Sequence, residues 1–359
     1  MTSDSAATVA GVLDGVADVD SAAAAAARAR HDSLVKPPGS LGRIEDLGVR
    51  LAAITGACPP PVPARPAVLV VAADHGVHAQ HVTPWPQQIT TVMVQQFCAG
   101  TAAVNAIART VGARVAVLDV GCAVAPPEHP LLRSRRVRAG TADLTQGPAM
   151  SRDDARESFL AGAERARELI GDGVDLLVCG DMGIANTTAS ACLIAAFTGA
   201  DAATVTGRGA GIDDDTLAHK TRIVGDALVL HAADLHHPVA ALAALGGLEH
   251  AALAGMMCAA AAARVPVLLD GVITNAAALV AVALCPAVAG YLIAAHRSAE
   301  PGAAVALDAL GLEPILDLGM RLGEGTGGLL AVPFVQAAAR TLGDMATLAE
   351  LGFAGDPTD

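Results

Sequence analysis

Short apolar runs alternate with alanine-rich helical stretches through the middle of the chain. Each run is rich in Val, Leu or Ile or ends in a glycine-rich turn: AVLVVAADHG (67–76), RVAVLDVG (114–121), VDLLVCGDMG (174–183), ATVTGRGAG (203–211), VPVLLDG (265–271) and PILDLGMRLGEG (314–325). Short strands that alternate with helices are typical of βαβ units around a buried parallel sheet. The pattern therefore predicts an α/β fold with a parallel β-sheet flanked by helices.

The two ends of the chain have a different pattern. Residues 17–57 carry an alanine-rich helical run, a break at KPPGSLGRIEDLG and a second helix-like stretch, and a Pro-rich linker (58–66) leads to the first strand. Helix returns from about Pro333. Because neither end alone has much apolar surface to bury, we expect residues 1–66 and 333–359 to form one small helical domain. Residues 67–332 would then be the large α/β domain.

Composition narrows the classes of protein to consider. Hydrophobic residues are 53% of the 359 and charged residues 16%, which supplies a large core and excludes a disordered chain. Aromatic residues are only 2%, which argues against stacking platforms for nucleic acid. The formal net charge of −13 also argues against a nucleic-acid partner. A few backbone N–H groups and one cation can still bind a small anion locally.

Cysteine usage and segment hydrophobicity bear on the location of the protein. The seven cysteines include no C-x-x-C pair, so reduced cytosolic thiols are expected rather than disulfides or a zinc ribbon. The N-terminus is acidic and lacks the basic region of a secretory signal. The uncharged run 271–295 contains Asn275 and Pro286 and begins at a strand-like stretch, which indicates α/β core rather than a membrane span. We expect a cytoplasmic protein with no membrane partner.

Glycine-rich turns follow two of the expected strands. In parallel sheets ligands bind beyond the carboxyl ends of the strands. GDMGIANTTAS (180–190) follows a strand and opens a helix, so its N–H groups could bind an anion, although an ordinary capped turn would look similar. GRGAG (207–211) allows close backbone approach. It is no dinucleotide fingerprint, because Ile212 occupies the third glycine position, and no Walker-type phosphate loop occurs.

Lys220 and Glu324 stand out from their surroundings. Of the 23 basic residues only Lys36 and Lys220 are lysines, and Lys220 follows the GRGAG turn closely enough to place an ammonium beside a phosphate. It could instead be a surface lysine paired with acidic neighbours. Glu324 lies between Gly323 and Gly325, where burial at the strand ends would raise its pKa and make it a general base. A solvated loop glutamate is the alternative.

Histidines cluster in DHGVHAQH, which contains Asp74, His75, His78 and His81. Asp and His at three-residue spacing can share a helical face and bind a metal. Gly76, the β-branched valines and the prolines that follow weaken that interpretation. A polar substrate-pocket loop is favoured over a metal site.

Taken together, the motifs resemble those of the nicotinate-nucleotide:5,6-dimethylbenzimidazole phosphoribosyltransferase family. The matching segments, in order over roughly residues 30–353, are KPPGSLG, ADHGV, TPWPQQIT, GDMGIANTT, GRGAG with the downstream HK, GGLEHAALAGMM, VPVLLDGVITNAAALVA, HRSAEPG, LGLEPILDLGMRLGEGTGG and DMATLAELGF. No single segment is specific, but their combination is.

The resemblance implies a fold, a reaction and a set of residues. The fold is a Rossmann-like sheet with a small helical domain, in a homodimer. The reaction moves the 5-phosphoribosyl group of nicotinate mononucleotide to a benzimidazole nitrogen, with no cofactor and no metal. Glu324 matches the catalytic base. The substrate-binding residues implied are Asp74, His75, Met93, Gly180, Asp181, Met182, Gly183, Asn186, Gly207, Arg208, Gly209, Gly211, Lys220, Leu322 and Gly323.

Two departures from the family pattern concern substrate contacts. Asp181 stands where relatives often have glutamate, so its reach is one methylene shorter. A glutamine that contacts the base in some relatives has no clear counterpart, because Val92, Met93 and Gln95 compete for its position. Three alternatives to this transfer reaction stay open: a related transferase with another azole, purine or phenolic acceptor, a metal-dependent hydrolase built on the histidine cluster, and a non-catalytic nucleotide-binding module.

Overall fold

A six-stranded parallel sheet forms the centre of the protein. The computed structural model describes residues 8–353. The strand order is β3-β2-β1-β4-β5-β6, with every neighbouring pair parallel. This is the doubly wound order, in which the chain reverses between β1 and β4, and it confirms the predicted α/β class. The strands are β1 (Pro66–Ala73), β2 (Arg114–Gly121), β3 (Leu132–Ser134), β4 (Leu176–Met182), β5 (Val267–Leu269) and β6 (Leu292–Ala294).

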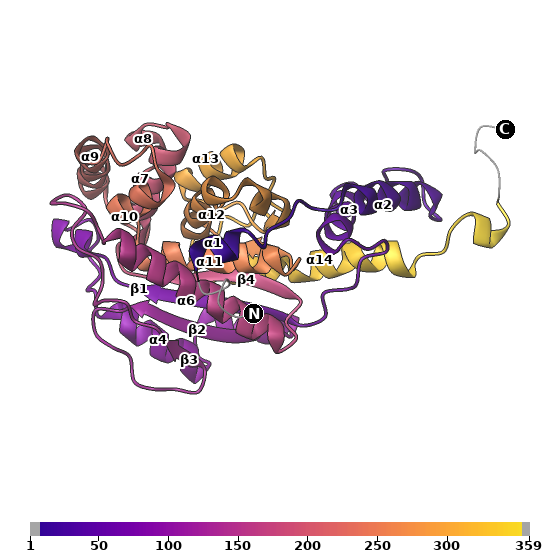
Figure 1. Cartoon of the computed structure of the whole chain (residues 1–359), viewed down its shortest axis with the longest axis horizontal. Helices are drawn as coiled ribbons and strands as arrows, with labels where there is room; N and C mark the ends of the chain where they lie inside the picture. Colours follow the sequence, from indigo (N-terminus) through magenta and orange to yellow (C-terminus); the bar gives the residue numbers. More distant parts are fainter. Residues whose placement is uncertain (1–7, 354–359) are drawn as a thin grey trace.

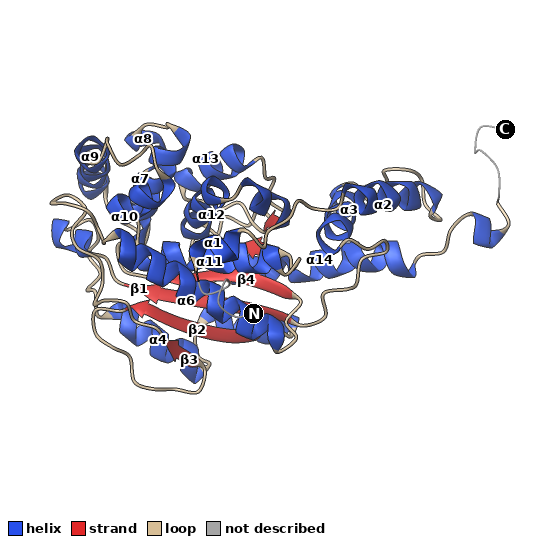
Figure 2. Ribbon diagram, viewed as in Figure 1, coloured by secondary structure: helices blue, strands red, loops and turns tan. Residues whose placement is uncertain are grey.

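Helices cover the sheet (Figures 1 and 2). In Figure 1, α6 (Arg152–Gly171), α11 (Leu248–Ala262) and α12 (Val272–Leu284) lie above the strands and α4 (Ile89–Ala99) lies below them, while α14 (Thr326–Asp344) packs on α5 (Ala103–Val111) and on β4 and β5. The remaining helices are α1 (Val9–Leu13), α2 (Ser21–Ser33), α3 (Arg43–Thr55), α7 (Asn186–Thr198), α8 (Ala202–Val205), α9 (Asp214–Leu230), α10 (Pro238–Leu245) and α13 (Pro301–Leu310), with 3-10 turns η2 (Gly76–Gln80), η3 (Pro286–Tyr291) and η4 (Ala349–Leu351).

Close helix packing explains how the core is filled with so few aromatic residues. Where α6 meets α11, a Cβ on Gly162 would lie 1.8 Å from the Ala252 carbonyl oxygen, and one on Gly255 would lie 1.9 Å from that of Phe159. Only glycine allows backbones to approach this closely. The core is therefore filled by small side chains at short interhelical distance, and dense packing replaces bulky rings.

Whereas α1 packs on α11 and α6, the helices α2 and α3 and the end of α14 project from the sheet as a separate lobe (Figure 1). Its own small core consists of Ala27, Ala52 and Leu342. A Cβ on Gly48 of α3 would lie 2.8 Å from Leu342 Cδ1, so α3 and α14 are in close contact. The helix α14 is continuous through Pro333, so one helix runs through the boundary expected at residues 332 and 333.

Two strand predictions are wrong and two strands were not predicted. Residues 203–211 form the end of α8 and an irregular loop, because Asp201 accepts a hydrogen bond from Thr204 N and starts a helical turn there. Residues 314–325 form a loop whose bridge to the sheet is the single pair His296–Leu316, since glycines with positive φ interrupt it. The three-residue strands β3 and β6 are too short to leave a sequence pattern.

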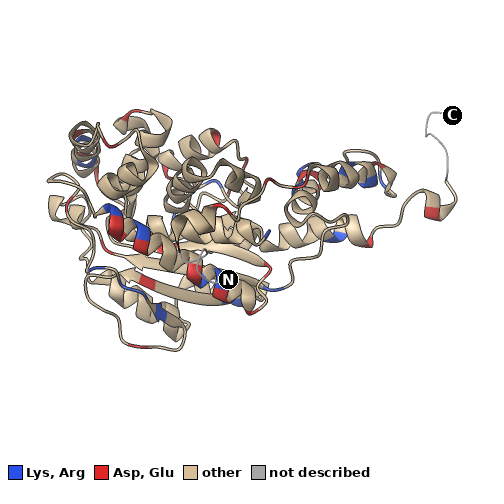
Figure 3. Cartoon of the chain, viewed as in Figure 1, with Lys and Arg blue, Asp and Glu red and all other residues tan. Residues whose placement is uncertain are grey.

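Charged side chains lie mainly on the outer helices (Figure 3). The exposed face of α6 carries both signs, and Glu168 and Asp154 on this helix pair with Arg133 and Arg138 from the segment after β2. Between residues 8 and 353, none of the helices is both long and apolar enough to cross a membrane. The uncharged run 271–295 instead forms α12, η3 and β6, and much of it is buried in the core.

Candidate active site

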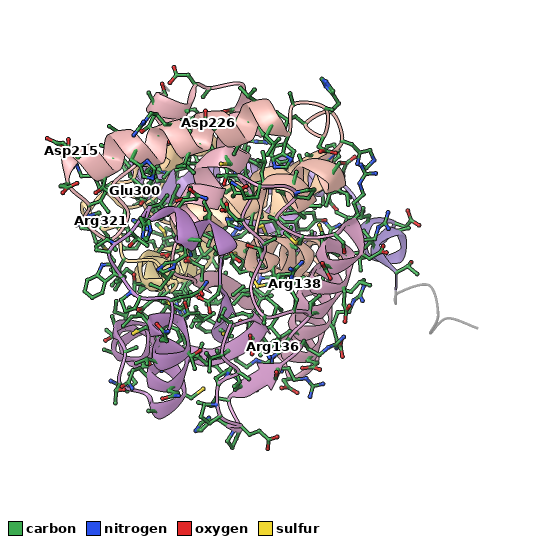
Figure 4. All side chains as sticks on the ribbon, turned by 90° about the vertical axis from the view of Figure 1, so that its left-hand side faces the viewer. Arg136, Arg138, Asp215, Asp226, Glu300 and Arg321 are labelled. Atoms are coloured by element: carbon green, nitrogen blue, oxygen red, sulfur yellow. The ribbon has the colours of Figure 1, made fainter. Side chains whose placement is uncertain are left out.

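The candidate site lies at the carboxyl ends of β1, β4 and β5, next to the point where the strand order reverses. Figure 4 looks onto this edge of the molecule. The end of β4 and the loop before α14 come into contact here: a Cβ on Gly180 would lie 2.6 Å from the Glu324 carbonyl oxygen, and one on Gly323 would lie 3.3 Å from Asp181 Oδ1. Gly180 and Gly323, both predicted to bind substrate, thus allow the strand end and the loop to meet, at the position where doubly wound folds bind ligands.

Glu324 is buried at this contact in an unusual backbone conformation. Its φ is +64°, a left-handed value for a residue with a side chain, and it is 6% exposed. Val104 N, in the first turn of α5, donates to Glu324 Oε2 at 3.4 Å. Burial raises the pKa of the Glu324 carboxyl, the Val104 N–H opposes that rise, and the charge of Asp270 adds to it. A buried carboxylate with a raised pKa has the properties of a general base.

Asp181, at the end of β4, is a second buried carboxyl beside this glutamate. Asn186 Nδ2 donates to Asp181 Oδ2 at 3.0 Å, while Oδ1 has no partner within residues 8–353. Burial raises the pKa of Asp181 well above its usual value, and the nearby charges of Asp270 and Glu249 raise it further. A protonated Asp181 could donate a hydrogen bond to a ligand.

Lys220 lies inside the protein, which excludes the surface-lysine alternative. It is 2% exposed, and its Nζ donates to Thr187 Oγ1 at 2.8 Å and to the Gly207 carbonyl oxygen at 3.0 Å. An ammonium has three N–H donors, so one is left for a ligand. Burial lowers the pKa of Lys220 to about 8, against the opposing charge of Glu300.

The glycine loop 207–211 is fixed by two charged residues that the sequence did not single out. Gly209 N donates to Glu300 Oε1 at 2.8 Å, and a Cβ on Gly207 would lie 2.1 Å from Glu300 Oε2. Arg321 donates to the Gly209 carbonyl oxygen, and Figure 4 shows Glu300 and Arg321 next to each other. Arg208 was predicted to bind substrate. Its guanidinium forms an ion pair with Asp214 on α9.

Asp74 and His75 lie in the wall of the site with their side chains engaged by the protein. Asp74 Oδ1 accepts from Thr90 Oγ1 at 2.6 Å, and Oδ2 accepts from Ala123 N at 2.7 Å. His75 Nε2 is 2.8 Å from Glu249 Oε1. Both side chains are buried; Asp74 connects the end of β1 to α4 and to the segment after β2, and His75 connects it to α11.

Glu249 is the centre of a buried polar cluster with His75 and His250. His250 Nδ1 is also 2.8 Å from Glu249 Oε1, and its Nε2 is 2.8 Å from Ser190 Oγ. Burial alone would raise the pKa of Glu249, but the two imidazoles hold it well below its usual value. Among residues 8–353 these three are the one set of His, Cys, Asp or Glu close enough to share a metal ion. The set lacks the predicted His78 and His81, and His75 Nε2 is hydrogen-bonded to the carboxylate while His250 Nε2 pairs with Ser190 Oγ.

The apolar residues expected near the aromatic base differ in exposure. Leu322 is 58% exposed and Val92 44%, whereas Met93 and Met182 are half-buried. Leu322 belongs to the loop that carries Glu324, and Val92 and Met93 belong to α4. The assignment of Met93 to substrate binding stays a prediction, and Val92, Met93 and Gln95 all belong to α4.

Comparison with known proteins places the chain in a family. Residues 16–352 match the family described as phosphoribosyltransferase. A nicotinate-nucleotide–dimethylbenzimidazole phosphoribosyltransferase of Salinispora tropica is 52% identical, over 94% of this chain and 97% of the relative. One of Chloroflexus aggregans is also 52% identical, over 95% and 96%. The crystal structure of the enzyme of that name from Thermus thermophilus superposes with a TM-score of 0.89 at 45% identity, covering 94% of this chain and all of that one. The chain therefore belongs to this phosphoribosyltransferase family.

Proposed function

We propose that the protein transfers the 5-phosphoribosyl group of nicotinate mononucleotide to 5,6-dimethylbenzimidazole, giving α-ribazole 5′-phosphate and nicotinate in cobalamin biosynthesis. The observation that carries the proposal is the buried Glu324 carboxyl in its glycine turn at the strand ends, in a chain similar over almost its whole length to enzymes of that name. No cofactor is needed, and no metal is assigned to the reaction.

The chemistry requires one base and accurate positioning. One azole nitrogen attacks C1′ of the ribose, and Glu324 takes the proton from the other nitrogen. The bond from C1′ to the nicotinate ring nitrogen breaks, and its electron pair stays on that nitrogen. Because the pyridinium is already cationic in the substrate, the leaving group needs no general acid. Attack from the opposite face converts the β anomer to the α anomer.

The phosphate of the donor binds beside Lys220. The remaining N–H of its ammonium, the loop 207–211 and the turn 180–186 line this part of the strand edge. A local cation and backbone N–H groups suffice for a phosphate even in an acidic protein. Met93, Met182 and Leu322 provide apolar contact for the acceptor base. The enzyme acts as a homodimer in the cytoplasm and has no nucleic-acid partner.

Replacing Glu324 with Gln tests the proposal directly. Formation of α-ribazole 5′-phosphate should fall by about 10² or more, the usual effect of losing a general base. Glu157→Gln, at an exposed position on α6, is the matched control and should retain full activity. Products are identified by mass spectrometry with a panel of benzimidazoles, purines and phenols as acceptors. Near-normal turnover of Glu324→Gln would contradict the assigned role, and preference for another acceptor would contradict the assigned substrate.

A further inference from the structure

Asp270 caps the helix that follows Glu324, although it comes from a different part of the chain. It is the residue after β5 and is 1% exposed. Its Oδ2 accepts from Gly325 N at 3.2 Å and its Oδ1 from Gly328 N at 2.9 Å. Gly325 is the N-cap of α14 and has no side chain to cap it, and Gly328 is three residues later. These are the two N–H groups that a capping box satisfies with two side chains, and here one carboxylate satisfies both.

The same hydrogen bond fixes the peptide unit that joins Glu324 to Gly325. The N–H of this unit is held by Asp270, and its carbonyl oxygen lies where a Cβ on Gly180 would be only 2.6 Å away. Glu324 has a φ of +64°, a left-handed conformation that is unfavourable for a residue with a side chain. The peptide is therefore constrained on both sides, and the constraint holds Glu324 in this conformation.

His296 in turn fixes Asp270. This buried residue follows β6 and places its Nε2 3.5 Å from Asp270 Oδ1. Its ring lies against the first turn of α14, where a Cβ on Gly327 would be 2.0 Å from His296 Cδ2. The carboxylate thus has little freedom to move away from the helix end.

Charged groups reach Glu324 from two strands. Asp181 faces it from β4 and Asp270 from β5, and both are carboxyls. The first turn of α14 contains no acidic residue, and α5 presents the Val104 N–H. His296 faces Asp270 from β6. Of these groups, Asp270 is the one whose charge the geometry holds in place by two backbone hydrogen bonds.

We propose that Asp270 is a positioning residue for the transfer reaction, which orients Glu324 through the cap of α14 and strengthens it as a base through its own negative charge. The inference rests on the proposed role of Glu324. In this proposal Asp270 does not touch the substrate. It acts on Glu324 through the Glu324–Gly325 peptide unit and through the electrostatic effect of its charge on the Glu324 carboxyl.

Asp270→Asn and Asp270→Glu separate the charge from the geometry. The acidic limb of the pH profile of kcat/KM reports the ionisation of the base. Asp270→Asn removes a negative neighbour, so the pKa of Glu324 falls and the limb moves to lower pH by about one unit. Its kcat should fall at least tenfold, with little change in the KM for nicotinate mononucleotide. Asp270→Glu keeps the charge but displaces it by one methylene, so kcat should fall while the limb stays near its wild-type position.

Asp175→Asn is the matched control. Asp175 also accepts two backbone N–H bonds, from Ala64 at 3.0 Å and Arg65 at 2.7 Å, but at the opposite end of the sheet. Losing these two hydrogen bonds should leave both kcat and the acidic limb of the pH profile unchanged.

The outcomes separate the two proposals. An inactive wild-type enzyme, or an active Glu324→Gln variant, overturns the proposed function or the role of Glu324. If wild type is active, Glu324→Gln is inactive and Asp270→Asn keeps the wild-type limb, the positioning role of Asp270 is wrong. If Asp270→Asn does not fold, Asp270→Glu decides: wild-type kcat in that variant overturns the inference. Circular dichroism establishes folding of each variant.

Discussion

Replacing Lys220 with Met should change the pH dependence of stability in a defined direction. The pKa of Lys220 is lowered from 10.5 to about 8 in the folded protein. Between those two pH values the unfolded chain holds a proton that the folded chain has lost, so the free energy of unfolding rises with pH. At about 1.4 kcal/mol per unit over roughly 2.5 units, the gain is about 3 kcal/mol. Methionine does not titrate, so the variant lacks this gain.

The quantity to measure is the difference in unfolding free energy between wild type and variant. Urea unfolding followed by circular dichroism at pH 7, 8, 9 and 10 gives both values at each pH, and titration of other groups cancels in the difference. The difference should shift in favour of wild type by about 1.4 kcal/mol per unit above pH 8. Arg222→Met, an exposed position two residues along α9, controls for removal of a cation. A difference that stays constant from pH 7 to pH 10 would refute the lowered pKa of the buried Lys220 ammonium.

The same substitution has a kinetic consequence. Loss of a charge-assisted hydrogen bond of about 1.5–3 kcal/mol should raise the KM for nicotinate mononucleotide by about 10- to 100-fold. In wild type that KM should rise above pH 8, as the ammonium loses its proton, and this rise should be absent in the variant. An unchanged KM would mean that the phosphate binds elsewhere.

Two further substitutions test the other buried carboxyls. Asp181→Asn should keep kcat at pH 7 within about tenfold of wild type, a barrier change below ~1.4 kcal/mol, because the raised pKa of Asp181 favours the neutral form that asparagine mimics. A larger loss in a steady-state assay would show that Asp181 must ionise. Glu249→Gln should lower the free energy of unfolding, measured by urea titration, by about 3–5 kcal/mol, because two buried imidazoles lose their carboxylate partner. A loss below about 1 kcal/mol would show that this cluster contributes little to stability.

From the sequence we could identify residues that do not suit the secondary structure around them. We missed residues that suit their neighbours in the sequence and whose partners are distant in the chain. Glu324 was identifiable because a carboxylate between two glycines fits neither helix nor strand. Asp270 and Glu300 were not, because their partners are N–H groups 55 to 91 positions away in the chain. Such pairings depend on how β5 and β6 are placed beside β4, which no local pattern encodes. The strand expected before the GRGAG turn is wrong, since apolar content alone does not separate a strand from a short capped helix.

An acidic chain can bind a phosphorylated substrate because its acids at the site are already engaged. Glu249 lies between two imidazoles, Asp270 accepts from two backbone N–H groups, and Glu300 accepts from Gly209 N. Burial and like charge raise the pKa of Asp181, which reduces its charge at neutral pH. The ammonium of Lys220 keeps a donor available. The electrostatic potential at the phosphate site therefore depends on these local pairings and not on the net charge of −13. Screened surface charges act weakly beyond about 10 Å. Because the His250 imidazole is a side-chain partner of Glu249, a substitution at His250 should weaken substrate binding more than a substitution that changes the surface charge by the same amount.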